Sequence, residues 1–263
     1  MAAQTEPVKS PAQQLAETTW SNYAGLLCKG DAGILSLYTA NALACADGEV
    51  AEGQAGITAL LQKKLSGGAP TFSSISVAGT GVASSGGVLV LIAGEMVVGT
   101  NTGRFNQVLY MVPDAKVAGG AGIQLDFFRT AATTGVTAEL NPVPAGKVVG
   151  EFVMSYYEAL KSNQSALQSA YRDSSQLTVD GVEITGGTKI LEQVSKFLGS
   201  TFEVQTIDIL PGAADGSMFI GFVCGVFIIK GETNPLLFCR VVGVTQDSAG
   251  LYLANDMFRI NYS

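Results

Sequence analysis

Apolar and polar positions change their spacing along the first half of the chain. From Pro11 to Cys28 apolar side chains recur every three or four residues, which predicts a helix. A short helix over 34–38, a hairpin turning at Asp47-Gly48 and a helix over 56–65 should follow. The apolar runs then become long, and they predict four strands, over 72–80, 88–98, 104–112 and 122–131.

The second half repeats this series, beginning with a helix predicted over 148–160. At an offset of 133 residues the following pairs match: Tyr23 and Tyr156, Leu27 and Leu160, Tyr38 and Tyr171, Asp47-Gly48 and Asp180-Gly181, Gly53 and Gly186, Ile57 and Ile190. Near the end of each half, Asp126-Phe127-Phe128-Arg129 matches Asp256-Met257-Phe258-Arg259 at an offset of 130. So many aromatic and glycine positions in register indicate a tandem duplication.

The duplication predicts the domain organisation. We expect a flexible N-terminus at 1–11, one domain at 12–132, a linker rich in Thr, Pro, Gly and Ala at 133–146, and a second domain at 147–263. Helices precede strands in each half, so the fold class should be α+β. The two domains should pack sheet to sheet as a pseudo-dimer.

Two charged residues interrupt the last apolar strand, Leu251–Ile260. Asp256 and Arg259 should therefore lie at a sheet edge or be paired, because an unpaired charge is costly to bury. We interpret them, with Phe258 and their counterparts Asp126, Phe128 and Arg129, as structural residues.

Composition describes a globular chain with an acidic surface. Of 263 residues, 47% are hydrophobic and 14% are charged, and the net charge is −7. Residues 1–132 carry seven basic and nine acidic groups, and residues 133–263 carry eight and thirteen. This balance argues against nucleic acid and anionic membranes as partners and suits a basic protein. The longest apolar run, Met218–Ile229, is shorter than the roughly 20 residues that a spanning helix needs, so we expect a soluble protein.

The chain contains no histidine, which excludes catalysis by Ser-His-Asp and Cys-His groups and mixed Cys/His metal sites. The four cysteines, Cys28, Cys45, Cys224 and Cys239, form no C-x-x-C pair. We expect free buried thiols, with Cys224 and Cys239 on neighbouring strands, and neither a metal nor a cofactor.

The second half resembles a known family. The motif runs Val149-Gly150-Glu151-Phe152-Val153-x-x-Tyr156-Tyr157-x-x-Leu160, Tyr171, Leu177-Thr178-x-Asp180-Gly181, Gly186-x-x-x-Ile190 and Asn255-Asp256-Met257-Phe258-Arg259. Over 148–262 it is similar to the nuclear transport factor 2-like family, and 12–131 resembles the same fold more distantly. The resemblance implies two cone-shaped, cystatin-like domains, each with three helices packed on a curved antiparallel sheet and a cavity at the open end.

The resemblance also implies a partner site in the second half. Family members carry the GDP form of the GTPase Ran and bind Phe-rich nucleoporins. Their rim acids fall at Asp180 and near Glu232 and Asn234; their cavity histidine falls at about Thr206, and their nucleoporin-binding tryptophan is Val179 here. One rim charge near Pro235 is kept and one is lost.

These implications lead to a non-enzymatic protein-binding module as the expected function, in the cytoplasm and nucleus: a nucleocytoplasmic transport factor or a derived adaptor. A structural subunit of a larger assembly is the alternative. A small-molecule-binding, isomerase-like or dehydratase-like cavity protein is the third reading. We expect the second half to bind the partner and the first half mainly to support it, so that charge reversal at Asp47 and Glu95 should matter little.

Overall fold

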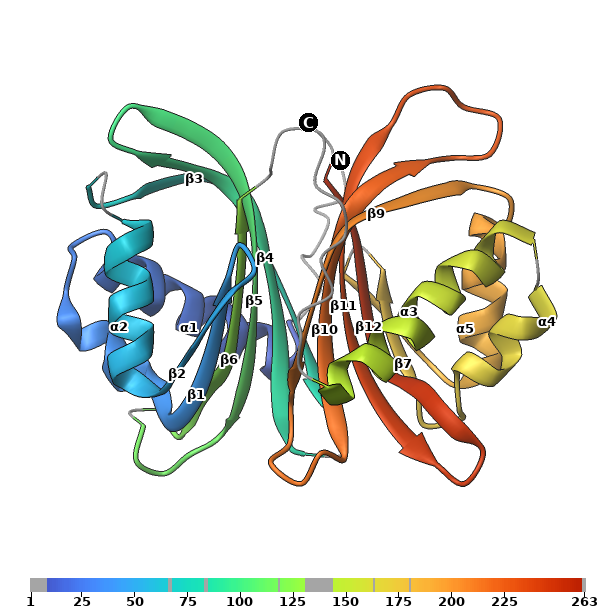
Figure 1. Cartoon of the computed structure of the whole chain (residues 1–263), viewed down its shortest axis with the longest axis horizontal. Helices are drawn as coiled ribbons and strands as arrows, with labels where there is room; N and C mark the ends of the chain where they lie inside the picture. Colours follow the sequence, from blue (N-terminus) through green and yellow to red (C-terminus); the bar gives the residue numbers. More distant parts are fainter. Residues whose placement is uncertain are drawn as a thin grey trace, which may run out of the picture.

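The computed structural model describes residues 9–65, 68–82, 85–117, 119–130, 144–162, 164–179 and 181–261. Figure 1 shows two curved sheets back to back, each with helices on its outer side. We call residues 9–130 the first copy and residues 144–261 the second copy. The linker predicted at 133–146 falls outside the described residues up to 143, and the helix of the second copy already begins at Pro144.

The first copy follows the predicted order of elements. Its helices and strands are α1 (Pro11–Leu27), the 3-10 helix η1 (Ala32–Leu37), β1 (Tyr38–Ala46), β2 (Glu49–Glu52), α2 (Gly53–Lys64), β3 (Thr71–Val82), β4 (Gly87–Val98), β5 (Asn101–Pro113) and β6 (Ala121–Thr130). The predicted second helix is one 3-10 segment, and Tyr38 belongs to the strand that follows it.

Local sequence signals explain several of these boundaries. Ser10 caps α1 by accepting a hydrogen bond from the backbone N–H of Gln13, and Pro11 begins the helix. Asp47 and Gly48 have φ values of 49° and 86°, the left-handed pair that joins two strands in a tight hairpin. The predicted hairpin between β1 and β2 is confirmed.

The second copy repeats the series. Its elements are α3 (Pro144–Ser162), α4 (Gln164–Leu167), η2 (Gln168–Ala170), β7 (Gln176–Val179), β8 (Val182–Thr185), α5 (Gly187–Val194), η3 (Ser195–Phe197), β9 (Thr201–Pro211), β10 (Met218–Ile228), β11 (Leu236–Asp247) and β12 (Gly250–Asn261). No helix among the described residues is both long and apolar enough to cross a membrane.

Both sheets have the same topology, which confirms the tandem duplication. Their strand orders are β2-β1-β6-β5-β4-β3 and β8-β7-β12-β11-β10-β9. Pairing is antiparallel except between β1 and β6 and between β7 and β12, which run parallel. The fold class is α+β, two cystatin-like domains in tandem.

Each copy has an apolar core of its own between its sheet and its helices. In the first copy, α1 lies so close to β3 that a Cβ on Gly79 would come 2.5 Å from the Cβ of Ala16. Any larger residue at position 79 would therefore push α1 away from β3.

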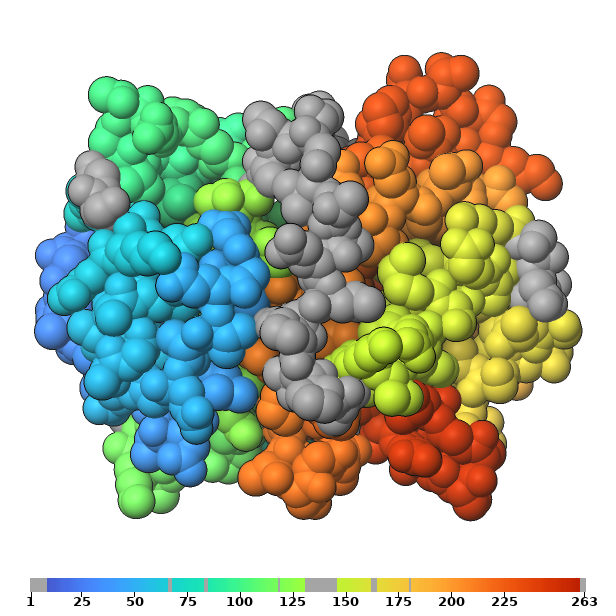
Figure 2. Space-filling model, in the orientation of Figure 1, coloured from blue at the N-terminus to red at the C-terminus, as the bar shows by residue number. Residues whose placement is uncertain are grey.

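A third apolar cluster joins the two copies. It combines side chains from the faces of both sheets that are turned away from the helices, among them Leu91, Val108, Phe127, Leu210, Phe222 and Met257. Phe127 of β6 contacts Phe222 of β10 edge to face, with ring centroids 6.1 Å apart. Figure 2 shows the copies as two lobes in contact, so the chain forms the expected pseudo-dimer within itself.

Two equivalent arginines, Arg129 and Arg259, make different polar contacts across this interface. Arg129 forms a bidentate ion pair with Asp208, with Nε–Oδ2 and Nη2–Oδ1 distances of 2.6 Å. The pairing of Val77 with Ile92 in the first copy corresponds to the pairing of Ile207 with Val223 in the second. The residue that follows Val77, Ala78, is therefore the counterpart of Asp208 and carries no carboxylate. The counterpart of Arg129, Arg259, therefore donates to the Ser76 hydroxyl instead.

The cysteines match the prediction in part. None of the four forms a disulfide; Cys45 and Cys239 are buried as predicted, whereas Cys28 and Cys224 are half-buried. Cys224 and Cys239 lie directly opposite each other on β10 and β11. Burial raises the pKa of the Cys45 and Cys224 thiols, so neither is suited to act as a nucleophile.

Candidate functional site

A buried polar cluster lies at the centre of the second copy. Asp256 on β12 accepts hydrogen bonds from Arg240 on β11, with an Nε–Oδ1 distance of 2.7 Å and an Nη2–Oδ2 distance of 2.5 Å. Nη2 also donates to the hydroxyls of Tyr156 and Tyr171, at 2.7 and 3.2 Å. Tyr171 donates to Asp256 Oδ2 at 2.7 Å. Asp256 is therefore paired, as the sequence analysis expected.

The electrostatics of this cluster do not suit proton transfer. The side chains of Arg240 and Asp256 are 4% and 0% exposed. Burial alone would lower the pKa of Arg240, but the Asp256 carboxylate holds it well above its ordinary value. The guanidinium carbon also lies 4.3 Å from the ring centroid of Tyr156. A carboxylate locked to a permanent cation is a poor general base.

The first copy contains the same cluster without its arginine. Asp126 accepts from Tyr38 at 2.5 Å, from Tyr23 at 3.1 Å and from Gln107 Nε2 at 2.7 Å. Gln107 lies opposite Phe128 as Arg240 lies opposite Phe258, so glutamine replaces arginine at equivalent positions. All three donors are neutral, and burial raises the pKa of Asp126 despite their hydrogen bonds.

This raised pKa predicts a pH dependence of stability. An acid that binds its proton more tightly in the folded state is most favourable at low pH, and its contribution is lost as pH rises from its unfolded pKa through its folded pKa. We expect Asp126→Asn to be less stable than wild type or equal to it near pH 4 and more stable near pH 8. The gain should be about 1.4 kcal/mol per unit of pKa difference.

Thermal unfolding of both proteins between pH 4 and 8 measures this effect. Glu95→Gln is the matched control, because it removes an acid from a half-buried position on β4 of the same sheet. Parallel stability curves for wild type and Asp126→Asn would contradict the prediction.

A cavity of about 170 Å³ opens beside Asp126 in the first copy. Its lining is mainly apolar, with Tyr23 and Asp126 at its polar end and with Asp47, Lys64 and Thr130 among its more exposed residues. Lys64 and Asp47 form an ion pair at 3.1 Å, and both side chains are 27% exposed. This pair marks the opening to solvent.

Larger side chains fill the equivalent space in the second copy. By strand register Leu177 replaces Ala44, Val179 replaces Ala46 and Phe227 replaces Met96. Phe197 stands at the offset position of Lys64 and contacts Phe227 and Phe258, with centroid distances of 5.7 and 5.4 Å.

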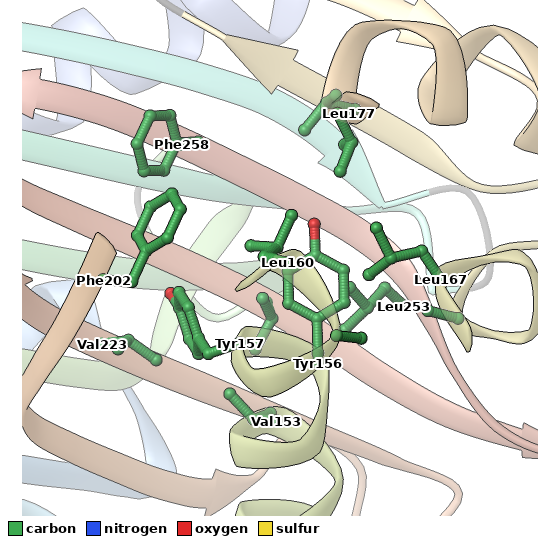
Figure 3. Packing of buried hydrophobic residues seen from close by; sticks show 14 of the residues in the cluster. Val153, Tyr156, Tyr157, Leu160, Leu167, Leu177, Phe202, Val223, Leu253 and Phe258 are labelled. Carbon is green, nitrogen blue, oxygen red and sulfur yellow. The ribbon is translucent and has the colours of Figure 1, made fainter. Parts of the chain in front are cut away.

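Figure 3 shows Tyr156 and Tyr157 side by side among Leu160, Phe202 and Phe258. Phe202 also stacks on Phe227, with ring centroids 4.6 Å apart. The two copies therefore differ in how much of the cone is packed with side chains.

The predicted partner residues of the second copy fall into two groups. The hairpin between β10 and β11 exposes Glu232 and Asn234. Val179, at the end of β7, faces Phe258, and Leu237 faces Asn261, so both segments reach the end of the sheet where β12 ends. Asp180 lies outside the described residues.

Thr206 lies elsewhere. It faces Cys224 across β9 and β10, and Cys224 packs against the cluster between the two sheets. Side chains alternate along a strand, so Thr206 is on the face turned to the first copy, whereas Ile207 enters the core of the second copy.

Sequence reasoning did not identify Arg240 or Gln107. The signal was present, because both stand in long apolar strands and are 133 residues apart. Among the described residues no group of three or more Cys, Asp and Glu side chains is placed to hold a metal ion.

Comparisons with known proteins locate the similarity. The nuclear transport factor 2 (NTF2) domain model matches residues 148–260. Nuclear transport factor 2 of Oryza sativa subsp. japonica is 32% identical over 120 residues, covering 45% of this chain and 98% of that relative. The Saccharomyces cerevisiae protein of the same name is 30% identical over 114 residues, covering 43% of this chain and 90% of that relative. Among solved structures, nuclear transport factor 2 from Cryptosporidium parvum has 27% identity and a TM-score of 0.41, and it covers 48% of this chain and 100% of that chain.

Proposed function

Because this chain belongs to the nuclear transport factor 2 family, we propose that it is a non-enzymatic protein-binding module, a nucleocytoplasmic transport factor or an adaptor derived from one. Its candidate partners are the GDP form of Ran, nucleoporins or both, and its compartments would be the cytoplasm and nucleus. The net charge of −7 suits a basic protein surface.

The observation that carries this proposal is the exposed end of the second copy. Glu232 and Asn234 stand exposed on the β10–β11 hairpin, and Ile229 at its base is 41% exposed. Val179 reaches the same end of the sheet. An acidic group beside an exposed apolar side chain is a surface on which a basic protein can dock. Asp180 belongs to this proposed site by sequence position.

The lack of enzymatic activity is part of the proposal. It is supported by the Arg240–Asp256 ion pair, in which both oxygen atoms of the buried carboxylate accept hydrogen bonds from the guanidinium. Proton transfer requires a group whose pKa lies near the working pH and which can reach a substrate. The packed aromatic side chains around the pair leave it little access to a substrate.

A binding measurement with purified Ran in its GDP form tests the proposal. We expect Glu232→Lys and Asp180→Lys to weaken binding at least about tenfold, because a rim charge that opposes the partner costs on the order of 1.4 kcal/mol or more. Glu95→Lys is the matched control, since it reverses an acid on the first copy and should leave binding unchanged. Equal loss from all three variants would show that the two copies bind alike.

A scaffold role in a larger assembly is the second candidate. Figure 1 shows the β4–β5 and β10–β11 hairpins projecting on the same side of the molecule, which would suit two-point docking. Affinity purification separates the candidates: co-purification of Ran and nucleoporins supports transport, and a stable stoichiometric complex with other proteins supports a scaffold. The third hypothesis, a cavity protein, is favoured by the cavity beside Asp126 in the first copy.

A further inference from the structure

We propose that the cavity of the first copy binds a small organic cation, an ammonium or amidinium group on a ring-sized apolar body, with Asp126 as its counter-charge. This site is separate from the protein-binding surface proposed above, and neither proposal depends on the other.

In the second copy the guanidinium of Arg240 occupies the position that we propose for the cationic group of the ligand. Nη2 of Arg240 alone contacts Asp256 Oδ2, the Tyr156 hydroxyl and the Tyr171 hydroxyl. These three oxygen atoms form a cage for one positively charged nitrogen. The ring of Tyr156 completes the cage on one side.

The first copy keeps these three oxygen atoms but lacks the cation, and both tyrosine hydroxyls donate to the carboxylate instead. Asp126, Tyr23 and Tyr38 are the equivalents of Asp256, Tyr156 and Tyr171. Gln107 is too short to replace the whole guanidinium: its Nε2 reaches Asp126 Oδ1, the contact that Arg240 makes through Nε. The contacts made by Nη2 have no cationic substitute.

The cation nearest along β6 serves another contact. Arg129 points to the opposite face of the sheet, where it is paired with Asp208. At the opening of the cavity, Lys64 is paired with Asp47, which also accepts from the backbone N–H and the hydroxyl of Thr130. At the opening the charges of Lys64 and Asp47 therefore cancel. The unbalanced negative charge of the cavity is that of Asp126, which lies deeper inside.

The size and lining of the cavity define the body of the ligand. Ala44, Ala46 and Met96 leave a space of about 170 Å³ where the second copy has Leu177, Val179 and Phe227. An apolar cavity of about 150 Å³ holds benzene. Tyr23 and Phe128 line the cavity and can contact the ring and the cationic group of the ligand. Their counterparts Tyr156 and Phe258 contact the guanidinium of Arg240 in the same way.

Titration calorimetry of the full chain with benzylamine hydrochloride, with benzyl alcohol as the neutral probe of equal shape, tests the proposal. We expect one benzylammonium per chain, bound at least about tenfold more tightly than benzyl alcohol. Binding should strengthen from pH 5 to pH 7.5, because the cation favours the ionised carboxyl over the protonated one. The groups that face Asp126 are Tyr23, Tyr38 and Gln107, and the Lys64–Asp47 pair lies further out.

Three variants separate charge from shape. Asp126→Asn should lose at least about tenfold in benzylammonium affinity, whereas Glu95→Gln, which removes an acid at a half-buried position of β4 outside the cavity lining, should not. Met96→Phe, or Ala44→Leu if that protein does not fold, should abolish binding of both probes by filling the cavity. Equal binding of the two probes, unchanged binding in Asp126→Asn, or absence of benzylammonium binding to wild type would overturn the proposal.

Discussion

Replacing Arg240 with methionine is expected to lower the free energy of unfolding of this protein by about 3–5 kcal/mol, the usual cost of removing one partner of a buried ion pair. Methionine keeps most of the volume of the side chain but leaves Asp256 without its cation. The carboxylate is fully buried, and of its hydrogen bonds only the one from Tyr171 would remain. Tyr156 would lose its bond from Nη2 as well.

Gln107→Met in the first copy is the matched control. It removes one neutral donor from Asp126, which keeps its bonds from Tyr23 and Tyr38, so we expect a loss of only about 1 kcal/mol. Urea unfolding followed by circular dichroism measures both variants, and a transition for each copy would assign the loss to one of them. Equal losses from the two variants would mean that the arginine contributes no more than a hydrogen bond.

The architecture could be predicted from the sequence because duplication leaves a signal in the spacing of residues. Tyr23 and Tyr156, or Asp126 and Asp256, are recognisable at fixed offsets even where neighbouring residues differ. In each copy these side chains meet in the same buried polar cluster, although they come from a helix and a strand far apart in the sequence. The same register places the short edge strand β8 by its match to β2, whose hairpin the Asp47-Gly48 turn already predicts.

The site was less predictable, because it depends on which face of a strand a residue occupies and on what stands opposite. Thr206 was expected near the cavity, but the alternation along β9 turns it toward the first copy. The cavity of the first copy arises from the small side chains Ala44 and Ala46, which carry no chemistry of their own. Only when both copies are superposed by strand register does the missing volume, and the missing arginine beside Asp126, become visible.

The interface between the copies shows the same divergence. Two identical domains would carry two equivalent Arg–Asp pairs across their shared face. Here Arg129 keeps its partner Asp208, whereas Arg259 faces the position of Ala78 and bonds to Ser76. The covalent link between the copies keeps their effective concentration high, so a single ion pair can suffice at this interface. The Arg129–Asp208 pair should therefore make most of the electrostatic contribution to the stability of the interface.

Asp208→Ala is accordingly expected to destabilise the protein by about 3 kcal/mol or more. The Asp208 side chain is 1% exposed and that of Arg129 is 12% exposed, so the substitution leaves a nearly buried guanidinium without its carboxylate. Cys45 would lose its hydrogen bond to Asp208 Oδ1 at the same time. Ser76→Ala, at the other side of the interface, removes only a hydroxyl acceptor from Arg259 and should cost about 1 kcal/mol.

Chemical unfolding measures the loss of stability in both variants. Small-angle scattering of the native proteins shows whether the two copies also separate from each other. If Asp208 mainly stabilises the interface, scattering of Asp208→Ala at low denaturant should show two separated lobes before either copy unfolds. Ser76→Ala should stay compact, because it leaves both the Arg129–Asp208 ion pair and the apolar cluster around Phe127 and Phe222 unchanged. Equal stabilities of the two variants would show that apolar burial alone holds the two sheets together and that the surviving ion pair contributes nothing measurable.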